Sequence, residues 1–188
     1  MLSTVMLLGL TLVAAVTAAF RNKIYNWNTY GGILAGLALS AAHSDWPWGW
    51  LGGPSLAESV GGFLTCGVLM VACFVFFPGI SGGDVKLMAM VGAWLGTKEL
   101  FARNDALEAL LWTFVLAACF GLIGLVWRVG PFTTVSRVVR MMGTKMRLPW
   151  FMPLSEEEHK ALQRPLFLAP SALVAVVIVR FGIMKYWS

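Results

Sequence analysis

Residues 59–83 read SVGGFLTCGVLMVACFVFFPGISGG, a stretch without one charged side chain that ends immediately before Asp84. About 20 apolar residues suffice to cross the hydrocarbon core of a bilayer as a helix. Two further uncharged runs of similar length occupy residues 1–20 and 109–127. These three runs predict transmembrane helices, and they decide the fold class.

Three weaker apolar segments bring the predicted number of spans to about six. They lie at residues 29–42, 87–97 and 166–179. The first two are short, so they must borrow interfacial residues or be shielded by neighbouring helices. The sequence therefore predicts an all-α membrane protein, with residues 1–188 forming a single transmembrane domain.

The overall composition supports this class. Hydrophobic residues make up 59% of the chain and charged residues only 12%, with a mean hydropathy of +0.77. A soluble domain carries about a quarter charged residues, so a water-soluble globular protein is excluded. The net charge of +5 indicates contact with anionic membrane lipids rather than with nucleic acid.

The distribution of Lys and Arg predicts the orientation. Ten of the 14 lie in the segments 21–28, 79–86 and 128–165, and four lie at or near the opposite side. Because basic segments stay in the cytoplasm, the N-terminus is expected on the opposite, outer side of the membrane. A secretory signal is not expected, since Arg21 and Lys23 follow the first apolar run instead of preceding it.

Segment 128–165 is the longest polar stretch and is expected at the cytoplasmic membrane surface. Its part 135–142, VSRVVRMM, fits either a short interfacial helix or a simple basic loop.

Small residues recur at the spacing by which membrane helices pack closely. Gly32 and Gly36 form one such pair, and Gly92 and Gly96 form another. Three cysteines also fall within predicted spans, without metal-ligand spacing, and are expected to be buried free thiols. They are Cys66, Cys73 and Cys119.

Asp84 is the ionisable residue that its surroundings explain least. It follows Ser81-Gly82-Gly83, a turn in which glycines give the backbone freedom, and it opens an apolar helix from Val85 to Trp94. A carboxylate at a helix N-terminus is stabilised by the helix dipole, which is a purely structural explanation. An ionisable residue at a membrane edge is also a candidate for function. From these residues alone both explanations stay open.

Two segments resemble the signatures of the prepilin peptidases (type IV leader peptidases), the bacterial GxGD intramembrane aspartyl proteases. Residues 81–87, SGGDVKL, resemble the family pattern Gly-x-Gly-Asp-x-Lys-Leu, with Ser81 at the first glycine. Residues 18–27 resemble the first signature, a basic stretch followed by Ile-Pro-Asn, with Tyr25 replacing the proline. Residues 94–96, WLG, and 164–170, RPLFLAP, are similar to later parts of the family pattern.

The resemblance implies an intramembrane aspartic endopeptidase with the family's helical bundle. Its substrate would be a pilin precursor with a basic leader, a glycine and an apolar helix, cleaved after that glycine at the cytoplasmic membrane face. The motif residues would be Asp84 as a catalytic acid, with Ser81, Gly82, Gly83, Lys86 and Asn26 around it. No metal or organic cofactor is implied. Lacking an insert with two CxxC pairs, the chain resembles the short Flp/Tad-pilus type, and no methyltransferase activity is expected.

Ala18 stands where the resemblance places the first catalytic aspartate. Aspartic proteolysis needs two carboxylates that share a proton, so the present sequence is predicted to be inactive. Either an Asp→Ala change was introduced, which the preserved flanking pattern favours, or the chain is a naturally inactive relative. A non-catalytic pilus-assembly pseudo-peptidase, a small transporter or channel, and an archaeal preflagellin peptidase are the alternatives.

Overall fold

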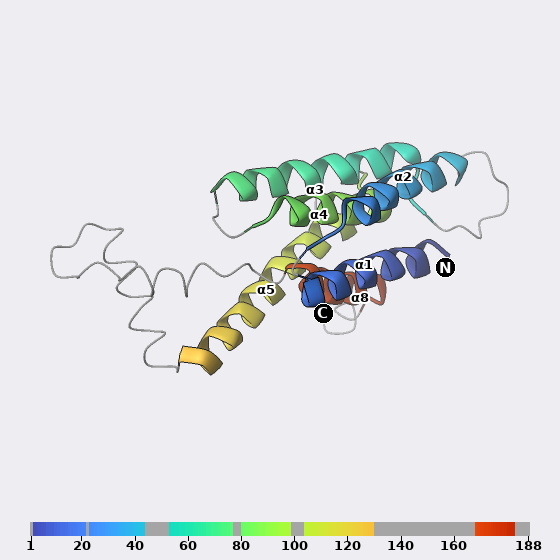
Figure 1. Ribbon diagram of the computed structural model, residues 1–188. Helices are drawn as coiled ribbons and strands as arrows, with labels where there is room; N and C mark the ends of the chain where they lie inside the picture. Colours follow the sequence, from blue (N-terminus) through green and yellow to red (C-terminus); the bar gives the residue numbers. More distant parts are fainter. Residues whose placement is uncertain are drawn as a thin grey trace.

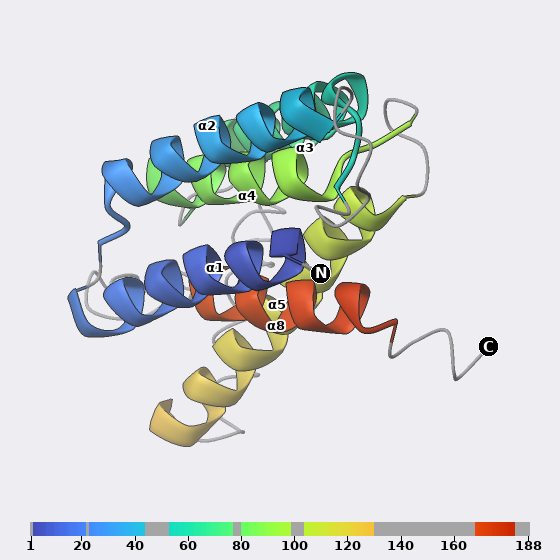
Figure 2. The same ribbon diagram turned by 90° about the vertical axis from the view of Figure 1, so that its right-hand side faces the viewer.

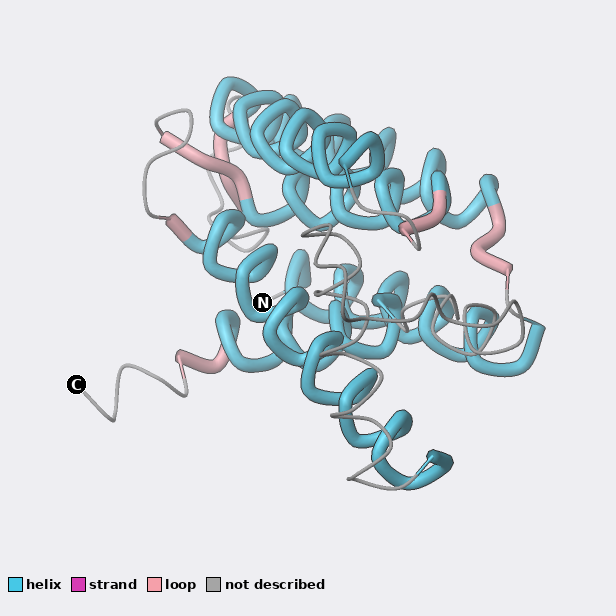
Figure 3. The backbone as a smooth tube through the Cα atoms, turned by 90° about the vertical axis from the view of Figure 1, so that its left-hand side faces the viewer, coloured by secondary structure: helices cyan, strands magenta, loops and turns pink. Residues whose placement is uncertain are grey.

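The computed structural model describes residues 2–21, 23–43, 53–76, 80–98, 104–129 and 168–182. The regular elements in these ranges are helices (Figure 3). They are α1 (Leu2–Arg21), α2 (Asn26–His43), α3 (Leu56–Phe76), α4 (Gly82–Leu95), α5 (Asp105–Val129) and α8 (Leu168–Arg180). The predicted all-α class is confirmed.

Three of these helices are long and apolar enough to cross a membrane: α1, α3 and the part of α5 from Asp105 to Gly124. They coincide with the three uncharged runs of the sequence. The other three are shorter or less apolar, and α4 has only 14 residues. At 1.5 Å per residue α4 rises about 21 Å, less than the roughly 30 Å of a bilayer core.

The helices alternate in direction along the chain. In Figures 1 and 2, α2, α3 and α4 form one layer, and α1 lies beside α8 in a second layer. α5 crosses both obliquely, and its C-terminal half extends away from the other helices (Figure 1). α1 and α3 end where α2 and α4 begin, and we call this the Asp84 end of the bundle. At the opposite end, the far end, Arg180 of α8 reaches the hydroxyl of Ser3 in α1 at 3.5 Å.

α4 is the central helix of the bundle. Every residue from Leu87 to Leu95 is buried, because α2, α3, α1, α5 and α8 all contact this helix. A helix that is apolar all round is stable only when it is surrounded in this way. The expectation that a short span is shielded by its neighbours therefore holds for α4.

Glycines bring α4 close to its neighbours. A Cβ atom added at Gly62 of α3 would lie 2.2 Å from the carbonyl oxygen of Gly92, and one added at Gly92 would lie 2.3 Å from that of Gly62. In α2, Gly32 faces the Met90 side chain and Gly36 faces the Trp94 ring. The predicted packing role of Gly32, Gly36 and Gly92 is confirmed.

Gly96 has a second role besides the predicted close packing. It lies just beyond the last residue of α4, with a φ of 71°, and its amide donates to the Gly92 carbonyl at 2.8 Å. Glycine adopts this left-handed conformation at no steric cost and commonly ends helices. Gly96 also packs closely, because a Cβ added at Gly62 would lie 2.9 Å from the Gly96 Cα and one added at Gly96 would lie 2.5 Å from the Pro54 Cβ. The predicted close packing at Gly92 and Gly96 is therefore confirmed, and Gly96 is in addition a helix cap.

The three cysteines are free thiols, as predicted, but their environments differ. Cys66 is buried, Cys73 is partly buried and Cys119 is exposed on α5. The prediction of burial is therefore right only for Cys66. An exposed apolar side chain suits the outer face of a membrane helix, where lipid replaces protein.

The interfacial helix or loop predicted at 135–142 lies outside the described residues. The segment that leads into α3 is described from residue 53 onward. There Ser55 and Glu58 cap α3 reciprocally, with Ser55 N donating to Glu58 Oε2 at 2.9 Å and Glu58 N donating to Ser55 Oγ at 3.3 Å.

Candidate functional site

The start of α4 is held by a capping box. Ser81 is the N-cap, with an extended backbone (φ −95°, ψ 155°). The Asp84 amide donates to Ser81 Oγ at 3.3 Å, and the Ser81 amide donates to Asp84 Oδ2 at 2.9 Å. This reciprocal pair satisfies backbone N–H groups that the first helical turn leaves without partners.

The capping box moves the start of the helix relative to the prediction. Gly82 and Gly83 belong to the first turn of α4, so Asp84 lies inside the helix and not in a glycine turn that precedes it. The expectation that the helix opens at Val85 is wrong, because Ser81 supplies the cap. Gly83 instead permits close packing, since an added Cβ would lie 3.2 Å from the Ile24 Cβ.

The Asp84 side chain is almost enclosed, with 6% of its surface exposed. Ser81 Oγ donates to Asp84 Oδ2 at 2.7 Å, in addition to the bond from the Ser81 amide to the same oxygen. Asp84 precedes the span predicted at 87–97. Burial raises the pKa of the Asp84 carboxyl above its ordinary value, and the hydrogen bonds from Ser81 act in the opposite direction. The site thus favours a carboxyl group that can hold a proton.

Ala18 lies at the same end of the bundle. It belongs to the last turn of α1, is partly buried and packs against the core cluster that includes Leu87 and Met88 of α4. The link that follows α1 continues this contact, because Ile24 touches Gly83. The structure therefore brings position 18 and Asp84 to the ends of two helices that contact one another.

The two signature segments also meet through their polar residues. Lys86 Nζ donates to Asn26 Oδ1 at 3.1 Å, across 60 residues of chain. The same ammonium lies 4.9 Å from the centre of the Tyr30 ring, a cation–π contact. Asn26 and Lys86 were predicted as motif residues, whereas Tyr30 was missed because no signature contains it. Ser81 and Gly82 are exposed at the helix start.

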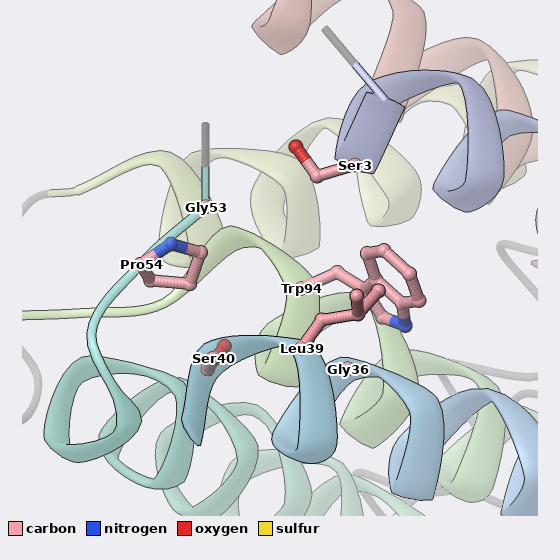
Figure 4. A pocket seen from close by; sticks show the side chains of 7 residues that line it. All are labelled: Ser3, Gly36, Leu39, Ser40, Gly53, Pro54 and Trp94. Carbon is pink, nitrogen blue, oxygen red and sulfur yellow. The ribbon is translucent and has the colours of Figure 1, made fainter. Parts of the chain in front are cut away.

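Two hollows flank α4. A groove of about 370 Å³ lies between α2, α3 and α4 and has Lys86 at one edge. A much smaller cavity of about 10 Å³ lies at the far end (Figure 4), lined by Ser3, Ser40, Trp94 and neighbouring residues. It holds space for about one water molecule. The Trp94 ring beside it is fixed, because its Nε1 donates to the Gly32 carbonyl at 2.8 Å.

The chemistry that the Asp84 end can perform follows from one buried carboxyl group. In the described parts of the chain, no three His, Cys, Asp or Glu side chains gather as metal ligands would. The carboxyl group of Asp84 can donate or accept a proton, but general acid–base cleavage by carboxylates requires a second one. Ala18, at the same end of the bundle, carries a methyl group and no carboxylate.

Comparison with known proteins gives one result for this region. The sequence model of the type IV leader peptidase family matches residues 5–125, which include both signature segments, most of α1, all of α2 to α4 and most of α5. No curated protein and no solved structure matches the chain.

Proposed function

The chain belongs to the type IV leader peptidase family, and from this premise we propose that it is an inactive form of a peptidase that removes the leader of pilin precursors. The family supports a leader peptidase function in general. The inactivity rests on one observation. Asp84 is a nearly buried carboxyl group, and the residue that would supply its partner is Ala18.

The proposed reaction needs both carboxyl groups. One is ionised and takes a proton from a water molecule, whose oxygen then bonds to the carbonyl carbon of the scissile peptide. The other is protonated and donates to the carbonyl oxygen. When the tetrahedral intermediate collapses, the C–N bond breaks and the amine of the mature pilin takes up a proton. The burial that raises the pKa of Asp84 suits it to the protonated role.

Ala18 removes this cooperation. A methyl group neither accepts the proton of the attacking water nor shares a proton with Asp84. Loss of a general acid or base typically lowers the rate by about 10²–10⁴-fold. We therefore propose that the present sequence does not cleave pilin precursors at a measurable rate.

A second candidate is a pseudo-peptidase with a non-catalytic role in pilus assembly. The bond from Ser81 Oγ to Asp84 Oδ2 favours it, because Ser81 replaces the first glycine of the signature and gives Asp84 a structural partner. In this alternative the role of Asp84 is structural: it occupies position N3 of α4 and forms the capping box with the N-cap residue Ser81.

The remaining details follow the same proposal. The substrate is a precursor with a basic leader, a glycine and an apolar helix, and cleavage after the glycine takes place at the cytoplasmic face of the bacterial inner membrane. The chain is assigned to the short Flp/Tad-pilus type, since its sequence has no CxxC pair.

A cleavage assay in membranes separates the two candidates. Ala18→Asp is expected to restore cleavage of a precursor probe, while Ala18→Asn, of nearly the same size but without a carboxylate, is not. Adding Asp84→Asn to Ala18→Asp is expected to abolish the restored activity. Cleavage by the unchanged chain would contradict the need for two aspartates.

A third variant addresses the pseudo-peptidase. Ala18→Asp combined with Ser81→Gly restores both signature positions. If neither this variant nor Ala18→Asp alone cleaves the probe while both remain folded, the non-catalytic candidate is correct.

A further inference from the structure

The groove between α2, α3 and α4 is lined, within the described part of the chain, by apolar residues and one charged residue, Lys86. α2 contributes Tyr30 and Ile33, and α4 contributes Val85, Lys86 and Ala89. The α3 residues are Phe63, Leu64, Gly67, Val68 and Val71. Three of these, Leu64, Val68 and Val71, belong to the large apolar side chains left exposed by the bundle.

Two of the residues that line the groove are small and adjacent. Gly67 of α3 and Ala89 of α4 lie side by side, since a Cβ at Gly67 would be 3.7 Å from the Ala89 Cβ. Larger side chains, among them Tyr30 and Phe63, also line the groove. Small residues on a helix surface let a further helix approach closely in a membrane. The shape therefore suits an apolar helix.

The charge of the groove lies at its Asp84 end. Among the described residues, the Lys86 ammonium contacts the Asn26 amide oxygen and the Tyr30 ring, both of which are electrically neutral. These contacts orient the ammonium without compensating its charge. A carboxylate on a bound helix would supply that compensation, because opposite charges attract at short range.

We propose that this groove holds the apolar helix of the substrate and that Lys86 pairs with a carboxylate on that helix. Lys86 is two residues from Asp84 along α4, so a helix lying in the groove reaches the Asp84 end of the bundle. The identity of the occupant as a substrate rests on the proposed function. Binding itself requires neither Ala18 nor a second aspartate, so it can be measured on the unchanged chain.

The test is binding of a fluorescent helical peptide to the protein in nanodiscs of zwitterionic lipid. The peptide carries a basic leader, a glycine and an apolar helix with one glutamate near its cytoplasmic end. Val68→Trp, which fills the groove, is expected to weaken binding by about 10-fold or more. Val115→Trp is the matched control, because Val115 on α5 is 50% exposed and Val68 is 55% exposed. It is expected to leave binding unchanged.

A second comparison tests the ion pair. Lys86→Met is expected to weaken binding of the glutamate peptide by about 10-fold and to leave a glutamine version of the peptide unaffected. Lys86→Arg is expected to retain binding of the glutamate peptide. Equal effects of Lys86→Met on both peptides would overturn the pairing.

A lipid molecule is the competing occupant of the groove. The same variants show whether lipid or the peptide helix binds there. If Val68→Trp lowers binding of an anionic lipid probe and leaves peptide binding unchanged, the groove is a lipid site and the proposal is wrong. Failure of the proposed function looks different, because Ala18→Asp would then not cleave although the peptide still binds in the groove.

Discussion

At Asp84, one carboxylate oxygen receives two hydrogen bonds from one residue. The amide and the hydroxyl of Ser81 both donate to Oδ2, while the Asp84 amide donates back to the Ser81 hydroxyl. The carboxyl group is therefore fixed in direction even though Ala18 offers it no partner. The N-cap interaction with Ser81 therefore orients Asp84, and a catalytic carboxyl group would need a fixed orientation as well.

The contribution of this cap to stability can be measured. Ser81→Ala is expected to lower the free energy of unfolding by about 1 kcal/mol, because the Asp84 amide loses its acceptor. Ser81→Thr keeps a hydroxyl at the same place and is expected to cost much less. Chemical unfolding in detergent, followed by circular dichroism, measures both. Equal stability of Ser81→Ala and the unchanged chain would mean that the cap contributes nothing.

The raised pKa of Asp84 predicts a pH dependence of stability. A carboxyl whose pKa is higher in the folded state binds its proton more tightly there, so its stabilising contribution is present below the unfolded pKa of about 3.9 and is lost as pH rises through the folded pKa. The unchanged chain is therefore expected to lose stability relative to Asp84→Asn as pH rises above about 4 toward neutral. Thermal unfolding of both proteins across this range provides the measurement, and parallel curves would contradict the prediction.

Only some residues of this site could be predicted from the sequence. Asp84, Lys86 and Asn26 were found because they occur in short recognisable strings. Neither motif predicts the hydrogen bond between Lys86 and Asn26, which lie 60 positions apart. This bond depends on how α2 packs against α4. Tyr30 was missed for the same reason. A tyrosine near a membrane boundary is common, and only the fold shows which cation it contacts.

Among the helices, α4 depends most on its neighbours. Ser59 of α3 donates to the Ala93 carbonyl at 2.6 Å, and Trp94 donates to the Gly32 carbonyl of α2. The small-residue spacing in the sequence correctly indicated close packing at Gly92. It could not show that Gly96, which also packs closely, ends α4 as well, because a helix-ending glycine and a packing glycine are the same residue type at the same spacing.

The close approach of α3 and α4 can be tested by comparing the stability of two glycine-to-alanine variants of α3. Gly62→Ala would place a methyl carbon 2.2 Å from the Gly92 carbonyl oxygen, and that oxygen is backbone that cannot rotate away. We expect a loss of about 1–3 kcal/mol, typical of overpacking. Gly67→Ala on the same helix meets only ordinary contact at 3.7 Å and is expected to be neutral or slightly stabilising. Thermal unfolding in detergent compares them, and equal stability of the two would be inconsistent with this packing.

For the whole molecule, the alternation of helix directions places the ends of α1 and α3 with the starts of α2 and α4. The charge distribution predicted the same grouping, because segments 21–28 and 79–86 were both assigned to the cytoplasm. The number of long spans was also predictable from charge-free runs. The oblique path of α5 was not, since hydropathy reports the length of a helix and not its tilt.

The predicted orientation can be tested with single cysteines in a cysteine-free background. Lys23→Cys at the Asp84 end is expected to react with a membrane-impermeant maleimide only after cells are permeabilised. Ser55→Cys at the far end is expected to react in intact cells. Both positions are exposed, so the difference between them reports sidedness. The reverse pattern would place the N-terminus in the cytoplasm.

The shortness of α4 has a consequence for how the protein is made. A nascent segment enters lipid by itself when lipid solvates it well and when it is long enough to cross. α4 is neither long nor lipid-facing, and it gains most of its contacts from α3. At the far end the Thr97 amide donates to the Glu58 carbonyl at 2.8 Å, which joins the two helices where they are farthest apart in sequence. We therefore expect α4 to enter the membrane together with α3, as a hairpin already paired inside the insertion machinery.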